Sequence, residues 1–213
     1  MRNEAIHSEE TEGIKLEVFH DEHAESPDNW GDTGQFIVYD HRDFYVERAA
    51  FNPDEIFEHF QANEGAKGNK LFKGFYVLPL YAYIHSGVSL ALRRNGDGQY
   101  WQHAGWDTSF KGFVLIKREK GSYTPEQVWN AAKGLVDTWN MYLSGDVYGY
   151  EVTGKDGGQL DSCFGFYGRD YAIQEAKAVF DAEVQAARKK RQERVKAMIR
   201  AQVPLKQRET VLK

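Results

Sequence analysis

Two polar side chains, His85 and Ser86, follow the most apolar stretch of the chain. A histidine can act as a general base and a serine as a nucleophile, so this pair could belong to a hydrolytic site. Adjacent residues in a strand or a tight turn point in different directions, so the two side chains would not form a dyad with each other. The chain also lacks the G-x-S-x-G signature of a nucleophile elbow. The alternative interpretation is a turn in which His85 bonds to the backbone.

Trp106-Asp107 is a second candidate, in a connection rich in aromatic and polar residues. Trp and Tyr are common anchors of binding interfaces, so this dipeptide could contact a ligand or a partner, together with Tyr83 at the end of the apolar stretch. The alternative is that Trp106 covers the core while Asp107 fixes a turn.

Asp146 and Asp161 form a third group with Tyr148 and Tyr167, because all four belong to one predicted hairpin. Two carboxylates near one hairpin could act as acid and base or bind Mg²⁺. A metal nuclease would need more acidic residues at close range, and the alternative role is that of strand-end caps. We predict neither a metal nor another cofactor. Cys163, in the same hairpin, is expected to be a buried thiol.

A dense cluster of basic residues lies near the end of the chain. Its members that could contact phosphates are Arg188, Lys189, Lys190, Arg191, Arg194 and Lys196. Such a cluster predicts nucleic-acid binding whose affinity falls steeply with salt, with Tyr and Trp side chains stacking on bases. The alternative is a solvated helix end, stabilised by the interaction of its cations with the helix dipole.

Composition places the chain among globular proteins with one substantial core. It has 213 residues, of which 41% are hydrophobic and 14% aromatic. Charge is unevenly distributed, because residues 1–32 hold ten acidic and two basic residues, whereas residues 188–213 hold ten basic and two acidic ones. The single cysteine excludes an intramolecular disulfide. The N-terminus is acidic and lacks the apolar core of a secretory signal, so we expect a cytoplasmic protein without a membrane segment.

The periodicity of apolar residues predicts an α+β fold. One antiparallel sheet of about five to seven strands is expected, with helices mainly on one face and a long C-terminal helix with a basic end. The strands expected are 14–19, 34–39, 75–83, 88–92, 111–117, 146–152 and 160–167. Helices are expected to begin at Asn52-Pro53, at Thr124-Pro125 and near Asp170. The domain plan is a disordered acidic segment over 1–13, a single domain over 14–187 and a basic helical extension or tail over 188–213.

Several of these segments together resemble an uncharacterised family of proteins from phages and other bacterial mobile elements. The likeness lies in LPLYAYIHSG (78–87), in Trp106-Asp107 followed by an apolar strand, in GDVYGYEV (145–152) and in DSCFGFYGRDY (161–171). It covers about residues 16–180 and is specific in the combination of motifs. Phe164 stands where the family pattern has Trp, and the basic C-terminal segment is outside the pattern. The family supplies no activity that could be assigned to these residues.

Three functions are compatible with these features. The resemblance and the acidic N-terminus favour a non-catalytic accessory protein that binds a host protein or nucleoprotein complex and inhibits or redirects it, as anti-CRISPR and anti-restriction proteins do. The first alternative is nucleic-acid binding by the basic C-terminal helix, and the second is a small hydrolase with His85 and Asp161 at one site. We further expect the four motifs to converge on one sheet edge or end.

Overall fold

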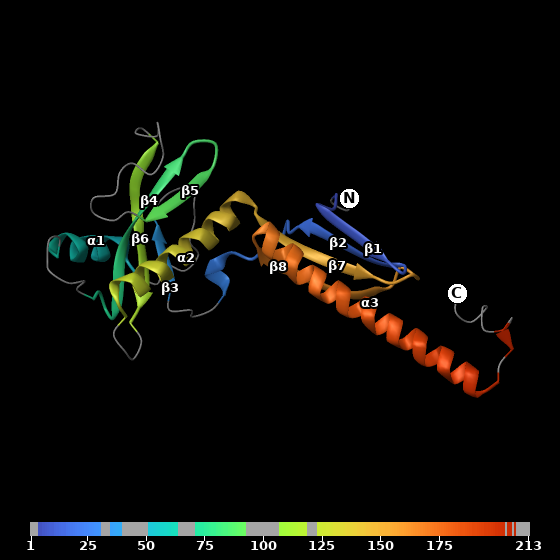
Figure 1. Cartoon of the computed structure of the whole chain (residues 1–213). Helices are drawn as coiled ribbons and strands as arrows, with labels where there is room; N and C mark the ends of the chain where they lie inside the picture. Colours follow the sequence, from blue (N-terminus) through green and yellow to red (C-terminus); the bar gives the residue numbers. More distant parts are fainter. Residues whose placement is uncertain are drawn as a thin grey trace. The chain divides into compact units, whose positions relative to one another are not determined.

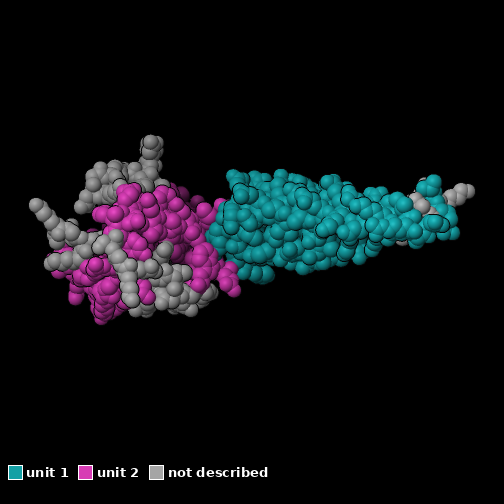
Figure 2. All heavy atoms as spheres, turned by 60° about the horizontal axis from the view of Figure 1, so that its bottom comes forward, with its two compact units in different colours: residues 1–24, 147–213 teal, residues 25–146 magenta. Residues whose placement is uncertain are grey.

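The computed structural model describes residues 4–30, 35–39, 51–63, 71–92, 107–118, 123–202, 204, 205 and 207. It divides the chain into two compact units, which Figure 2 shows in different colours. Unit 1 is discontinuous in sequence and consists of Met1–Ala24 and Val147–Lys213, whereas unit 2 is the continuous segment Glu25–Asp146. None of the helices among the described residues is long and apolar enough to cross a membrane.

Unit 1 is an antiparallel sheet with one long helix on one face (Figure 1). Its strands are β1 (His7–Thr11), β2 (Ile14–His20), β7 (Val147–Thr153) and β8 (Gln159–Tyr167), in the order β1-β2-β7-β8. The helix is α3 (Arg169–Arg200). Alternate residues of β2 and β7, such as Leu16, Val18 and Val152, are fully buried and pack with Ala176 and Phe180 of α3. This alternation is the period of a strand with one buried face.

Strand β1 overturns the expectation that residues 1–13 are disordered. It pairs with β2 from His7↔Val18 to Thr11↔Ile14. Two ion pairs tie this hairpin to α3: Lys177 Nζ lies 2.6 Å from Glu9 Oε1, and Arg188 Nε lies 2.7 Å from Glu12 Oε1. The sequence HSEET has no apolar residues, so periodicity could not predict this strand. Backbone hydrogen bonds to β2 and ion pairs with cations distant in sequence stabilise it instead.

Unit 2 is a second antiparallel sheet, with a helix on each face. Its strands are β3 (Gln35–Tyr39), β4 (Phe75–Ile84), β5 (Val88–Leu92) and β6 (Thr108–Lys117), in the order β3-β6-β4-β5. Its helices are the short 3-10 helix η1 (Pro27–Asn29), α1 (Pro53–Ala62) and α2 (Pro125–Ser144). The α2 side chains Val136 and Trp139 share a core with Leu80 and Val114. On the other face, Ile56 of α1 packs with Phe113 and Leu115.

The α+β class, the antiparallel pairing and the long C-terminal helix are therefore confirmed. Two features differ from the expectation: the strands form two four-stranded sheets instead of one, and the segment expected to be a single domain falls into two units. In unit 2 the helices also cover both faces, not mainly one. The periodicity of a strand indicates which of its residues are buried, but it does not identify the strand that pairs with it. Pairing depends on contacts between segments that are distant in sequence.

Asn140 of α2 satisfies the backbone of Leu90 in β5, an edge strand among the described strands of unit 2. Its side-chain oxygen accepts a hydrogen bond from the Leu90 N–H at 2.7 Å, and its side-chain amide donates to the Leu90 carbonyl at 2.9 Å. The amide thereby takes the place that a further strand would have beside β5. Edge strands with unpaired backbone groups invite pairing with other chains, so this contact protects the edge.

Replacing Asn140 by Ala should lower the free energy of unfolding by about 1–3 kcal/mol, because both Leu90 backbone groups lose their partner in a half-buried setting. Chemical denaturation of the full chain measures this change. Asn130→Ala is the matched control, since Asn130 is an exposed residue of the same helix, and its effect should stay within about 0.5 kcal/mol. Equal effects of the two substitutions would contradict the proposed role of Asn140.

Candidate functional site

His85 and Asp107 meet at one end of the unit 2 sheet. His85 follows β4, and Asp107 immediately precedes β6, the neighbour of β4. His85 Nδ1 lies 3.4 Å from Asp107 Oδ2, and the Ile84 N–H donates a hydrogen bond to the Asp107 carbonyl at 3.1 Å. The Tyr83 ring stacks on the imidazole with a centroid distance of 6.2 Å and an interplanar angle of 21°. The HSG motif and Asp107 therefore do lie together, as expected from their positions at strand ends.

This pair is open to solvent. The side chains of His85 and Asp107 are 69% and 42% exposed, and Ser86 is exposed as well. In water, such a pair is screened and contributes little to stability. General-base catalysis would need a substrate held against the imidazole, and the described residues around this pair form no enclosure for one. The geometry suits a surface contact better than catalysis. Trp106, the other half of this motif, lies outside the described residues.

Gly145-Asp146, the start of the GDVYG motif, ends a helix. Gly145 adopts a left-handed conformation with φ of 72° at the C-terminus of α2. Its N–H donates to the Tyr142 carbonyl at 3.1 Å, and the Asp146 N–H donates to the Met141 carbonyl at 2.8 Å. This is the Schellman pattern of helix termination, which needs a residue tolerant of positive φ. Asp146 thus takes part in helix termination through its backbone N–H, which is a different role from the strand-end cap of the alternative interpretation.

The rest of GDVYG pairs with DSCFGFYG inside the unit 1 sheet. Tyr148 is opposite Phe166, and Tyr150 is opposite Cys163, so β8 has one residue more than β7 between these pairs. Gly165 occupies this bulge with a φ of 87°. The Phe164 ring lies directly over Gly149, since a Cβ added to Gly149 would come within 2.0 Å of it. Besides the strand pairing, a side-chain contact therefore joins the two motifs: an aromatic ring covers a glycine on the neighbouring strand.

Four residues singled out from the sequence have different exposures in this hairpin. Tyr148 is buried and contacts the His20 ring at a centroid distance of 4.7 Å. Asp161, opposite Val152, and Tyr167, opposite Val147, are half-buried. Burial raises the pKa of the Tyr150 hydroxyl, and the negative charge of Asp161 raises it further. Cys163 is exposed, so the expectation of a buried thiol is wrong. Because β8 is an edge strand, its side chains have neighbours on one side only.

The four motifs do not share one sheet edge, so that expectation is wrong. HSG and Asp107 belong to the unit 2 sheet, whereas VYG and DSCFGFYG belong to the unit 1 sheet, and Asp146 ends the segment between them. Likewise, neither unit contains the His85 and Asp161 pair that a hydrolase would need. Among the described residues there is also no group of three or more His, Cys, Asp or Glu arranged to hold a metal.

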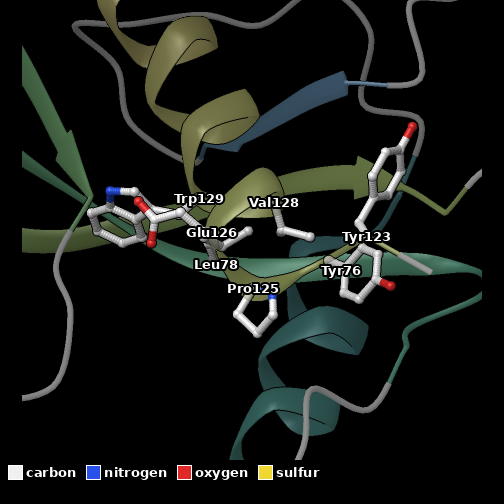
Figure 3. Close-up of a pocket in the computed structure, with 7 residues that line it drawn as sticks. All are labelled: Tyr76, Leu78, Tyr123, Pro125, Glu126, Val128 and Trp129. Atoms are coloured by element: carbon white, nitrogen blue, oxygen red, sulfur yellow. The ribbon is translucent and has the colours of Figure 1, made fainter.

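A hollow of about 490 Å³ in unit 2 was not indicated by the sequence. It lies between β4 and the first turn of α2, and Figure 3 shows its lining residues. Leu78 and Val128 form an apolar floor, and the Tyr76 and Tyr123 rings meet edge to face at 6.4 Å. None of the candidate binding or catalytic residues predicted from the sequence lines this hollow.

The basic residues of the C-terminal cluster are exposed on α3. The last buried residue of this helix is Val184, although the helix continues to Arg200. We call residues 188–200 the basic segment; it contains seven Lys or Arg and one Glu. Arg188 pairs with Glu12, and its hydrogen bond is the main cause of a lowered pKa of that carboxyl group. Within the described part of the chain, the other six cations have no ion-pair partner within 4.0 Å.

No protein-family model, curated protein or solved structure matches the chain. The resemblance to phage and mobile-element proteins therefore stays a prediction, and the function has to be argued from the residues.

The contact between Gly149 and Phe164 gives a direct test of the motif pairing. Gly149→Ala should lower the free energy of unfolding by about 1–3 kcal/mol, because the new methyl group overlaps the ring. Adding Phe164→Ala should recover much of that loss, since it removes the ring. Denaturation of the two single variants and the double variant measures this coupling.

Gly134→Ala is the matched control, because it is in α2 and an added Cβ there meets nothing within 4 Å. It should stabilise the protein by about 0.5–1 kcal/mol through helix propensity. Additive effects of Gly149→Ala and Phe164→Ala would refute the contact.

Proposed function

We propose that the chain binds nucleic acid through the basic segment of α3. The observation that supports this most directly is a run of six exposed cations on a regular helix without ion-pair partners in the described chain. Cations of a purely structural, solvated helix are commonly balanced by acids three or four residues away. Here the segment has a single acid, Glu193, whereas the whole chain has a net charge of −5. A polyanion would supply the missing negative charge.

Binding of this kind has a quantitative signature in its salt dependence. If about five phosphates are neutralised, the logarithm of the association constant should fall against the logarithm of the salt concentration with a slope of about −4.5. Affinity for a labelled 20-bp duplex, followed by fluorescence anisotropy, should then drop about 10³-fold between 50 and 200 mM salt. Replacing Lys189, Lys190, Arg194 and Lys196 together by Gln should reduce the slope by about 4, because four phosphate contacts are lost.

The matched control removes four charges from unit 2, by replacing Lys73, Lys111, Lys117 and Lys133 with Gln. It changes the net charge equally and should leave the slope unchanged. An equal loss of affinity in both quadruple variants would show that only net charge matters, and the proposal would then fail.

A second candidate is binding to a host protein or nucleoprotein complex, as the resemblance implies. The observation that favours it is the group of exposed side chains His85, Ser86 and Asp107, beside the half-buried Tyr83 that stacks on the imidazole. The acidic N-terminus supports partner binding less than expected, because two of its carboxylates, Glu9 and Glu12, already pair with cations of α3. The hydrolase is not proposed, because its two residues lie in different units.

His85→Ala tests this second candidate. The free energy of unfolding should change by less than about 1 kcal/mol, because the imidazole is exposed and its pair with Asp107 is screened. A stoichiometric partner recovered from a bacterial lysate by the unchanged chain should be lost from the variant. If stability falls markedly, or if the variant retains the same partner, this group of side chains is not the binding surface.

A further inference from the structure

We infer that the nucleic acid bound by the basic segment is duplex DNA, and that the helix lies in its major groove. This inference rests on the proposed function and narrows it to one class of ligand. It follows from three properties of the segment: its shape, the distribution of charge around the helix, and its lack of aromatic side chains.

The shape of the segment suits a wide groove. Figure 1 shows α3 continuing past the ends of the strands of unit 1, and its side chains from Arg188 to Arg194 are all exposed. Thirteen helical residues extend about 20 Å, and a helix with its side chains is about 10–12 Å in diameter. The major groove of B-form DNA is about 12 Å wide and admits such a helix. The major groove of A-form RNA is deep and narrow and does not.

Five of the six cations without ion-pair partners lie on two sides of the helix. At about 100° per residue, Lys189, Lys196 and Arg200 follow one side. By the same rotation, Lys190 and Arg194 follow another side, about 120° away. A helix in the major groove has a phosphate backbone on each flank, so two rows of cations match the two strands.

Between these rows, helical rotation places Glu193 and Ala197. These are side chains suited to base edges, since Glu accepts a hydrogen bond from the cytosine amino group and Ala contacts the thymine methyl group. Val195, Met198 and the remaining cation, Arg191, fall on the opposite side, which continues the sheet-facing side of α3. Val195 and Met198 are accordingly half-buried, unlike the cations. The basic segment therefore has one face for DNA and one face away from it.

Single-stranded nucleic acid fits the basic segment less well than duplex DNA does. Binding of single-stranded nucleic acid relies on aromatic side chains on which bases stack. The basic segment has no Phe, Tyr, Trp or His. Tyr171, an exposed aromatic residue of α3, precedes Arg188 by about 25 Å of helix. The stacking contribution that was expected with the basic cluster is thus missing from the segment itself.

The test compares three labelled probes with the full chain: a 20-bp DNA duplex, the RNA duplex of the same sequence and one DNA strand. The DNA duplex should bind at least about tenfold more tightly than the other two, because only it offers the groove. A duplex carrying glucosylated hydroxymethylcytosine, whose sugars fill the major groove, should lose at least about tenfold in affinity. Netropsin, which fills the minor groove, should leave the affinity nearly unchanged.

Two variants test the orientation. Ala197→Glu puts a carboxylate between the two rows of cations and should weaken DNA binding at least about tenfold. Val195→Glu adds the same charge on the opposite side and should weaken it by a few-fold at most. Circular dichroism of both variants confirms that the helix is retained.

The outcomes separate the two proposals. Equal affinity for RNA or single strands, no effect of the glucosylated duplex, or equal effects of the two Glu variants would overturn the major-groove inference while leaving nucleic-acid binding in place. Absence of salt-dependent binding to every probe would overturn both.

Discussion

Unit 1 depends on the antiparallel pairing of β2 with β7. These strands are in register from Lys15↔Thr153 to His20↔Tyr148, and all of unit 2 separates them in sequence. Without this pairing, the unit would consist of two separate hairpins, which are marginally stable in water. The pairing creates the continuous apolar face on which Ala176 and Phe180 of α3 pack. The direction of the basic segment is therefore fixed by a strand contact far away from it in sequence.

Charge is used in two different ways in unit 1. Along the sheet, Lys177 and Arg188 of α3 pair with Glu9 and Glu12, so opposite charges hold β1 and the helix together. Past the end of the sheet, the cations outnumber the acids and have no such partners. The boundary lies at Arg188, the last cation of α3 that pairs with the described chain. The cations of α3 up to Arg188 thus stabilise the fold, and those after Arg188 are available to attract a polyanion.

The sequence predicts the local elements well, because their signals are local. Thr124 and Gln127 form a reciprocal capping box at the start of α2, and Gly145 ends that helix, as their residue types indicate. The β7–β8 hairpin also follows from its glycine-rich turn. The division into two sheets does not, because strand pairing is decided by contacts across many residues. The roles of Asn140 and Phe164 were missed for the same reason: each acts on a residue in another element, Leu90 or Gly149.

The chain leaves unit 1 and returns to it at neighbouring points. The Asp21 N–H, just after β2, donates a hydrogen bond to the Val147 carbonyl at the start of β7, with a distance of 2.8 Å. A link of a few residues could span that gap. In topological terms, unit 2 is an insertion into a β-hairpin connection. Gain, exchange or loss of unit 2 during evolution would leave the strand register of unit 1 unchanged. Unit 1, with its helix α3, could therefore occur with a different domain inserted between β2 and β7.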